Sequence, residues 1–287
     1  MTGNLILSVF LPIALAIVMI GLGLHLSLAD FRRVAKTPRA VVVALLIQTG
    51  LLPLLAFALA FGFDLPPEIG LGLVLLAASP GGVTANLFSH LARGDVALNL
   101  SLTAINSALA LLTLPLWTAL GLAWLIGSEQ AVPPPTGKLI EVGMLVLLPV
   151  LIGMGLRAWR PTVADRLDRP VRVLSTLILV GLILAAMVIE RQVLIEHALT
   201  LGGVVLLFNL ASLLSGYAAG RLVKLAVPQA TAIAFEIGIH NGTLAIFVAL
   251  NVLQMPSAAV APALYSLLMY VTGGLFVWWL LRRQRMA

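Results

Sequence analysis

The chain has 287 residues, of which 61% are hydrophobic and only 10% are charged, and its formal net charge is +6. An ordinary soluble domain carries roughly 25% charged residues, so this composition excludes a water-soluble fold. Nucleic-acid binding is not indicated either, because the basic residues lie in short segments between apolar runs rather than along one soluble face. We therefore expect an all-α polytopic membrane protein.

Nine apolar stretches approach the length of about 20 residues that crosses a bilayer as a helix. The first has no basic segment before it and exceeds the apolar core of a signal peptide, which is about 7–15 residues long, so we predict a spanning helix there. Pro133, Pro134 and Pro135 predict an extended connector within 127–137, between two halves of one transmembrane unit that covers residues 1–287. The nine stretches are residues 5–28, 38–62, 69–92, 96–127, 138–156, 171–189, 200–220, 229–253 and 258–281.

The basic residues predict how the chain crosses the membrane. If the first span begins outside, 15 of the 17 basic residues lie on the inner side, and only Lys138 and Arg191 lie outside. Cytoplasmic loops carry an excess of lysine and arginine. We therefore predict that the amino terminus lies outside and the carboxyl terminus lies in the cytoplasm.

Two of the nine stretches are interrupted near their middle. Residues 79–82 (Ser-Pro-Gly-Gly) break the third stretch, and residues 238–242 (Gly-Ile-His-Asn-Gly) break the eighth. Proline removes a backbone donor and glycine favours unwinding, so each stretch should form two half-helices with freed backbone groups. A single break is often only a kink. Corresponding breaks in two halves instead indicate inverted repeats, with the two interrupted helices crossing at a transporter's binding site.

Glu236 lies deep in the eighth stretch, where a charged side chain costs at least ~2.5–3.5 kcal/mol. Lysine and arginine lie only at the ends of these stretches and never in their interior, so a bound cation or a proton is the expected partner of this carboxylate. His240 follows one helical turn later, on the same face, and could share an ion or a proton with it. Asn86 and Asn241 follow the breaks and offer amide oxygens that suit sodium, although each could simply cap a half-helix.

Polar residues in neighbouring stretches could reach the same centre. Asn99, Thr103 and Asn106 recur at i, i+4 and i+7, which is one helix face, although such residues also join helices by hydrogen bonds. Gln48 is the only amide in 38–62. Packing or an interfacial position explains the remaining polar residues at least as well: Asn209, Ser212, Ser215, His25 and His90.

Three motifs resemble those of one family over nearly the whole chain. Residues 80–86 (Pro-Gly-Gly-Val-Thr-Ala-Asn) are similar to a Pro-Gly-Gly-x-x-Ser-Asn crossover, and residues 236–241 (Glu-Ile-Gly-Ile-His-Asn) to a Glu-x-Gly-x-Gln-Asn crossover. Residues 91–98 (Leu-Ala-Arg-Gly-Asp-Val-Ala-Leu) resemble the intracellular turn that follows the first crossover. These motifs are typical of the bile acid:sodium symporter family, in its bacterial nine-span branch, which implies a bacterial inner membrane.

The resemblance implies a panel domain from 5–28, 138–156 and 171–189 and a core domain from 38–127 and 200–281, with substrate in the crevice between them. It also implies two sodium sites and an organic anion as substrate. The first sodium site would use Asn86, Asn99, Thr103 and Glu236, and the second would use Gln48, Glu236, His240 and the carbonyls of Ile237 and Ile239. The candidate substrate-binding residues are Thr84, Asn106, Asn209 and Asn241.

The chain departs from the family pattern at the ion sites. Ala85 stands where the family has serine, Asn99 stands where it has serine on the next helix, and His240 stands where it has glutamine. Imidazole is a poor sodium ligand and a good proton carrier. The expected function is therefore sodium-coupled symport of an organic anion, either a bile acid or a small carboxylate. A proton-coupled carrier or exporter on the same fold is the alternative.

Other classes of function have less support in the sequence. A membrane sensor or channel scaffold would be expected to carry a soluble domain, which the chain lacks. An enzyme is not expected, because the spans contain no paired aspartates, Ser-His set or zinc motif. We expect sodium ions or protons rather than an organic cofactor, and membrane lipid and an organic anion rather than nucleic acid as partners.

Overall fold

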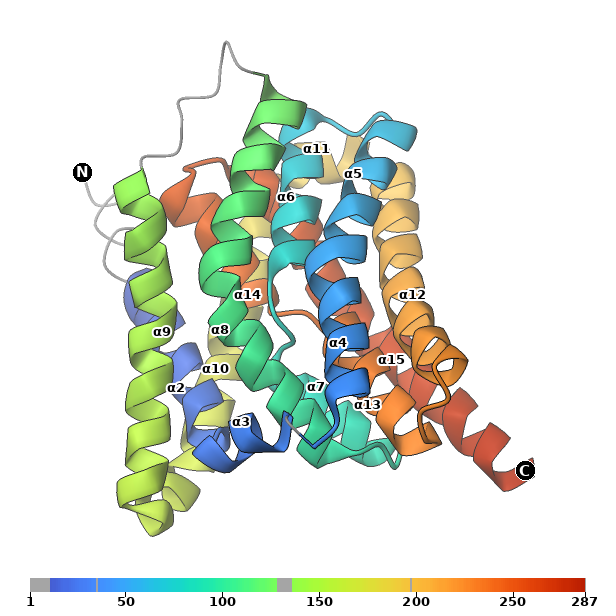
Figure 1. Cartoon of the computed structure of the whole chain (residues 1–287). Coiled ribbons are helices and arrows are strands. Elements are labelled where there is room, and N and C mark those ends of the chain that lie inside the picture. Colours follow the sequence, from blue (N-terminus) through green and yellow to red (C-terminus); the bar gives the residue numbers. More distant parts are fainter. Residues whose placement is uncertain (1–10, 35, 128–135, 197, 287) are drawn as a thin grey trace.

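The computed structural model describes residues 11–34, 36–127, 136–196 and 198–286. Within these ranges the chain is all-α, as predicted, and forms a bundle of long and interrupted helices (Figure 1). The first half contains α2 (Leu11–His25), α3 (Leu28–Val34), α4 (Pro38–Leu46), η2 (Ile47–Leu51), α5 (Leu52–Gly62), α6 (Pro67–Ala78), α7 (Val83–Leu91), α8 (Val96–Gly121) and η3 (Leu122–Ile126). The second half contains α9 (Thr136–Trp159), α10 (Pro161–Ile189), α11 (Arg191–Glu196), α12 (Ala198–Leu222), α13 (Val227–Gly238), α14 (Gly242–Phe247), η4 (Val248–Val252), η5 (Pro256–Ala259) and α15 (Val260–Met286).

The helices carry the apolar surface that a bilayer requires. Large side chains on them point outward, and Leu112, Leu184 and Val271 are 74%, 56% and 62% exposed. Exposed apolar surface on this scale is typical of a face that contacts lipid. Among the described residues, five helices are long and apolar enough to cross a membrane: Pro38–Gly62, Val96–Ile126, Pro161–Ile189, Leu199–Leu222 and Pro256–Arg283. Four shorter apolar helices accompany them: Pro12–His25, Pro67–Ala78, Leu147–Trp159 and Gly242–Val252.

Several boundaries differ from the prediction. Helix α10 begins at Pro161, ten residues before the predicted start at 171, because the charged segment 161–170 continues the helix beyond its apolar part. Helix α9 already begins at Thr136, inside the predicted connector, while residues 128–135 with the three prolines lie outside the described residues. The short helices α3 and α11 lie in predicted loops, where apolar length gives no signal.

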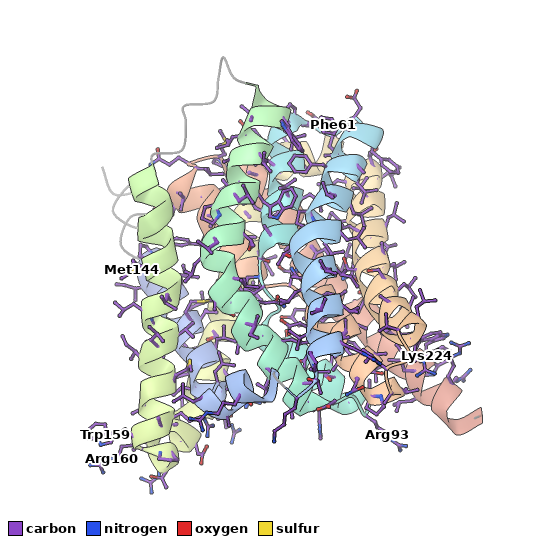
Figure 2. All side chains as sticks on the ribbon, viewed as in Figure 1. Phe61, Arg93, Met144, Trp159, Arg160 and Lys224 are labelled. Atoms are coloured by element: carbon purple, nitrogen blue, oxygen red, sulfur yellow. The ribbon has the colours of Figure 1, made fainter. Side chains whose placement is uncertain are left out.

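The basic residues gather at one end of the bundle. Figure 2 shows Arg93, Arg160 and Lys224 at the end opposite Phe61. At the carboxyl end of α15, the guanidinium of Arg282 lies 4.0 Å from the ring centre of Trp278. Trp and basic side chains in this arrangement are typical of a membrane interface.

Two turns in the two halves of the chain share one geometry. After α5, the amide of Leu65 donates to the carbonyl of Ala60 at 2.9 Å, and Asp64 has φ 49°. After α12, the amide of Leu225 donates to the carbonyl of Gly220 at 2.9 Å, and Lys224 has φ 61°. Each turn leads into the first half of an interrupted helix, so residues 60–65 and 220–225 hold equivalent places.

Helices α2 and α9 approach so closely that glycines are required between them. A Cβ atom on Gly23 would lie 2.2 Å from the carbonyl oxygen of Val150, and one on Gly153 would lie 2.5 Å from that of Ile20. Small residues at membrane helix interfaces allow such backbone contact. Helix α10 packs on both helices, so α2, α9 and α10 form one packed group.

We predict that Gly153→Ala destabilises the protein by roughly 1–3 kcal/mol, because the added methyl group must separate α9 from α2. Gly155→Ala is the matched control on the same helix, since a Cβ there meets nothing within 4 Å. Thermal unfolding of the two purified variants measures the difference. Equal melting temperatures would contradict the prediction.

Candidate ion and substrate site

The two interrupted helices meet at their breaks. Helix α6 ends at Ala78 and α7 begins at Val83, while α13 ends at Gly238 and α14 begins at Gly242. The amide of Gly82 donates to the carbonyl of Ile239 at 2.7 Å, and the amide of Asn241 donates to that of Pro80 at 2.9 Å. Gly81 and His240 thus form an antiparallel bridge. Lipid cannot hydrogen-bond to the backbone groups that the breaks leave unpaired. The two hydrogen bonds between the breaks satisfy some of these groups. We call this paired segment, residues 79–82 and 238–242, the crossing.

The Glu236 carboxylate lies against the crossing and is fully buried. Thr103 donates its hydroxyl to Oε2 at 2.5 Å, and Asn106 donates its amide to Oε1 at 2.9 Å. Asn99 lies farther away, with 3.4 Å between Nδ2 and Oε2. Glu236 forms no ion pair with any residue that the structure describes. The carboxylate is therefore surrounded by neutral donors from one face of α8, which is the face that the i, i+4, i+7 spacing predicts.

Gly81 lies directly against this carboxylate. A Cβ atom built on Gly81 would stand 2.5 Å from Cδ of Glu236 and 2.6 Å from each carboxylate oxygen. The backbone of the first break therefore approaches the acidic side chain of the second as closely as only glycine allows. The sequence motif contains Gly81, but it does not reveal this contact.

Several amide oxygens near the crossing have no hydrogen-bond partner in the described part of the chain. Asn99 and Asn106 each donate to Glu236 and leave the oxygen Oδ1 free, and Gln48 and Asn86 also keep free oxygens. Buried polar atoms are ordinarily paired, so such atoms need an explanation. Neutral oxygens beside a carboxylate are the ligand type that hard cations such as sodium prefer.

Gln48 and His240 meet on a different atom, the carbonyl oxygen of Ser79. Gln48 lies in a π-helical turn, Ile47–Leu51, a feature frequent at functional sites. Its Nε2 donates to the carbonyls of Ser79 at 2.8 Å and Ala77 at 3.0 Å. The Nδ1 atom of His240 lies 3.3 Å from the same Ser79 oxygen. These two predicted ion ligands are therefore brought together at the first break.

The prediction that His240 shares a helical face with Glu236 is wrong, because α13 ends at Gly238 and His240 lies in the extended break. Its ring stacks on Phe208, with 5.9 Å between ring centres, and meets Tyr265 edge-on at 5.4 Å. Its Nε2 atom has no partner among the described residues.

Asn209 contacts the crossing but does not line the cavity described below. Its Nδ2 donates to the carbonyl of Gly238 at 3.0 Å, and Thr272 donates to its oxygen. The hydroxyl of Tyr265 donates to the same Gly238 carbonyl at 2.8 Å. Tyr265 is a residue that the sequence reasoning missed. A tyrosine inside an apolar stretch usually has a hydrogen-bond partner for its hydroxyl, and this rule could have indicated a contact of Tyr265 with the break.

A cavity of about 280 Å³ adjoins the crossing. On one side it is lined by Thr84 and Asn86 from α7 and by residues 240–243 of the second break. Asn241 also caps α14, because its Oδ1 accepts from the amide of Leu244 at 3.1 Å. Of the predicted substrate residues, Thr84 and Asn241 line the cavity, whereas Asn106 and Asn209 do not. Residues of α2 and α10 also line it, so the cavity lies where these two helices face the crossing.

Comparison with known proteins places this arrangement in a family. Residues 12–197 match the Sodium Bile acid symporter family. The chain is 30% identical over 273 residues to the uncharacterized sodium-dependent transporter YocS of Bacillus subtilis, covering 95% of this chain and 80% of that protein. It is 28% identical to the probable sodium/metabolite cotransporter BASS1, chloroplastic, of Arabidopsis thaliana, covering 91% of this chain and 64% of that protein.

The same chain is 30% identical to sodium/bile acid cotransporter 4 of Homo sapiens, covering 94% of this chain and 63% of the human protein. It thus spans slightly less than two thirds of the length of the Arabidopsis and human relatives. These matches confirm the resemblance that the crossover motifs indicate. The chain is a multi-pass membrane protein and belongs to the sodium bile acid symporter family, whose members are transporters rather than enzymes.

Proposed function

We propose that the protein is a sodium-coupled symporter of an organic anion that works by alternating access. The observation that carries the proposal is the Glu236 carboxylate, which is fully buried, contacts only neutral donors and adjoins unpartnered amide oxygens. An uncompensated charge at this depth is costly, and a bound cation removes that cost. The relatives in Bacillus, Arabidopsis and human are each named for sodium, which supports the choice of ion.

Two sodium positions fit the side chains at the crossing. The first uses Asn86, Asn99, Thr103 and Glu236, and the contacts of Thr103 and Asn99 with the carboxylate support it. We assign Asn106 to this sodium site rather than to the substrate site, because its amide also donates to Glu236. The second uses Gln48, Glu236, His240 and the carbonyls of Ile237 and Ile239. Its support is the shared contact of Gln48 and His240 with Ser79.

The substrate binds in the cavity between a panel domain and a core domain. The panel comprises the spans predicted at 5–28, 138–156 and 171–189, and the core comprises 38–127 and 200–281. Thr84, Asn86 and Asn241 stand at the beginnings of half-helices on the core side, where partial positive charge attracts an anion. The paired breaks and the equivalent turns at 60–65 and 220–225 support nine spans with two inverted triplets.

The cavity opens toward the cytoplasm in this conformation. It is lined by His25 and His90, and His90 is exposed and lies three residues before Arg93, which stands at the basic end of the bundle (Figure 2). By the positive-inside rule the basic end is cytoplasmic, which puts the amino terminus outside and the carboxyl terminus inside a bacterial inner membrane. The conformation is therefore the inward-facing state of the transport cycle.

Proton coupling is the second candidate. It is favoured by His240, whose Nε2 has no partner among the described residues, and by Ala85, which removes a hydroxyl that the family pattern places beside Asn86. An imidazole in that position can carry a proton between states.

Thermal unfolding in sodium, potassium and choline chloride at several pH values tests the proposal. A ligand that binds only the folded state stabilises it by about 2.7 kcal/mol at a hundred times its Kd. We expect a saturable increase in melting temperature with sodium, and none with potassium or choline. If sodium does not change the melting temperature, and Glu236→Gln abolishes a dependence of the melting temperature on pH, then sodium symport is wrong and the proton-coupled carrier is supported.

A further inference from the structure

The wall of the cavity opposite the crossing carries an arginine. Arg172, Ser175 and Thr176 of α10 line this wall, together with His25 at the end of α2. Arg172 is the one lysine or arginine among the described residues that line the cavity. The crossing side offers only neutral groups and helix ends, so a full positive charge for an anion comes from α10.

Arg172 belongs to a charged cluster that joins α2 to α10. Its guanidinium donates to Oδ2 of Asp168, one turn earlier on α10, while His25 Nε2 lies 2.6 Å from Oδ1 of the same carboxylate. The other ring nitrogen of His25, Nδ1, lies 2.7 Å from the carbonyl oxygen of Gly21. Both nitrogens thus face oxygen acceptors.

Asp168 therefore contacts both α2 and α10, and this fixes Arg172 at the cavity wall. The guanidinium has five N–H donors, and a single bond to Asp168 leaves others for a ligand. The side chain of Arg172 is 55% exposed, so it can reach an anion at the cavity.

We propose that Arg172 binds the carboxylate of a small organic acid, and that Asp168 and His25 position the guanidinium for it. This inference rests on the proposed function and narrows its substrate class. The cavity of about 280 Å³ is just below the ~300–1,000 Å³ typical of sites for drug-sized ligands, which favours a small carboxylate over a bile acid. The bound acid then lies between Arg172 and the half-helix beginnings at Thr84 and Asn241 across the cavity.

Binding of defined acids to purified protein in saturating sodium tests the role of Arg172. The probes are acetate, pyruvate, 2-oxobutanoate and pantoate, with pyruvamide as an uncharged comparison and taurocholate as a bulky one. We expect Arg172→Gln to weaken binding of the best small acid about 10- to 150-fold, as for loss of a hydrogen bond to a charged group. Arg172→Lys should lose less. Arg169→Gln is the matched control, because Arg169 lies on the same helix but lines a different surface with Pro170 and Val173.

Three outcomes overturn this inference: wild type binds none of the small acids, taurocholate binds more tightly than all of them, or Arg172→Gln binds like wild type. Sodium-dependent stabilisation without any acid separates these failures from failure of the proposed function. It should persist in Arg172→Gln, because no contact joins Arg172 to Glu236 among the described residues. A missing sodium response in wild type would instead reject the symport proposal.

A double-mutant cycle tests the positioning role of His25. We expect His25→Gln to weaken binding of the best small acid when Arg172 is present and to cause no further loss in Arg172→Gln, because His25 acts only through Asp168 and the guanidinium. His90→Gln serves as control, since His90 also lines the cavity. An equal loss from His25→Gln in both backgrounds would reject its role.

Discussion

Sodium-dependent uptake is expected to disappear when Glu236 is replaced by glutamine. The amide keeps the size of the side chain but removes the only negative charge among the residues that meet at the crossing. Removing one partner of a buried charge interaction costs roughly 2–5 kcal/mol, or about 30-fold or more in sodium affinity. The folded state should not be weakened in the same way, because burying the carboxylate is itself costly.

Uptake of radioactive sodium into proteoliposomes, together with thermal unfolding with and without sodium, measures this effect. Glu196→Gln is the control, because it makes the same chemical change on an exposed residue of α11. We expect the control to match wild type in both assays. Sodium uptake by Glu236→Gln would show that the carboxylate is not part of the ion site.

Gly81→Ala is expected to cause the second large loss, without changing any side chain that binds an ion. The new methyl group would stand 2.5–2.6 Å from the carboxylate carbon and oxygens of Glu236, so the carboxylate must leave its position. Overpacking of this kind costs roughly 1–3 kcal/mol of stability. Sodium should then no longer stabilise the protein, because Thr103 and Asn106 hold the carboxylate only in its present place.

Melting temperatures of Gly81→Ala with and without sodium check the prediction. Gly181→Ala is the control, since its Cβ would meet nothing within 4 Å and alanine favours a helix by about 0.8–1 kcal/mol over glycine. Combining Gly81→Ala with Glu236→Asp shortens the crowded side chain and should recover stability without recovering the sodium response. A normal sodium response in Gly81→Ala would show that the carboxylate does not need this position.

Apolar length and backbone chemistry predict the all-α fold and both interrupted helices. The stretch predicted at 38–62 is helical from Pro38 to Gly62, and both predicted breaks lie where α6 and α13 end. Apolar length does not predict the helix at 161–170, because this part of α10 is charged and extends beyond the apolar segment. It also cannot reveal the π-helical turn at Ile47–Leu51, because no residue type in that segment requires one.

The candidate site was predictable only where one helix sets the geometry. The spacing of Asn99, Thr103 and Asn106 along α8 is sufficient to aim all three at one point. Contacts between helices depend on packing that spacing does not encode, which is why the positions of Asn209 and Tyr265 were not foreseen. Helical spacing gives the wrong position for His240, because α13 ends at Gly238, before that residue.

The backbone bridge between Gly81 and His240 limits how the protein can move. The hydrogen bonds from Gly82 to Ile239 and from Asn241 to Pro80 join the two interrupted helices at their unwound segments. If these helices slid past one another, both bonds would break and polar backbone would be left in a medium without water. In the proposed alternating-access cycle, we therefore expect the crossing to move as one rigid unit, with the displacement at its interface with α2 and α10.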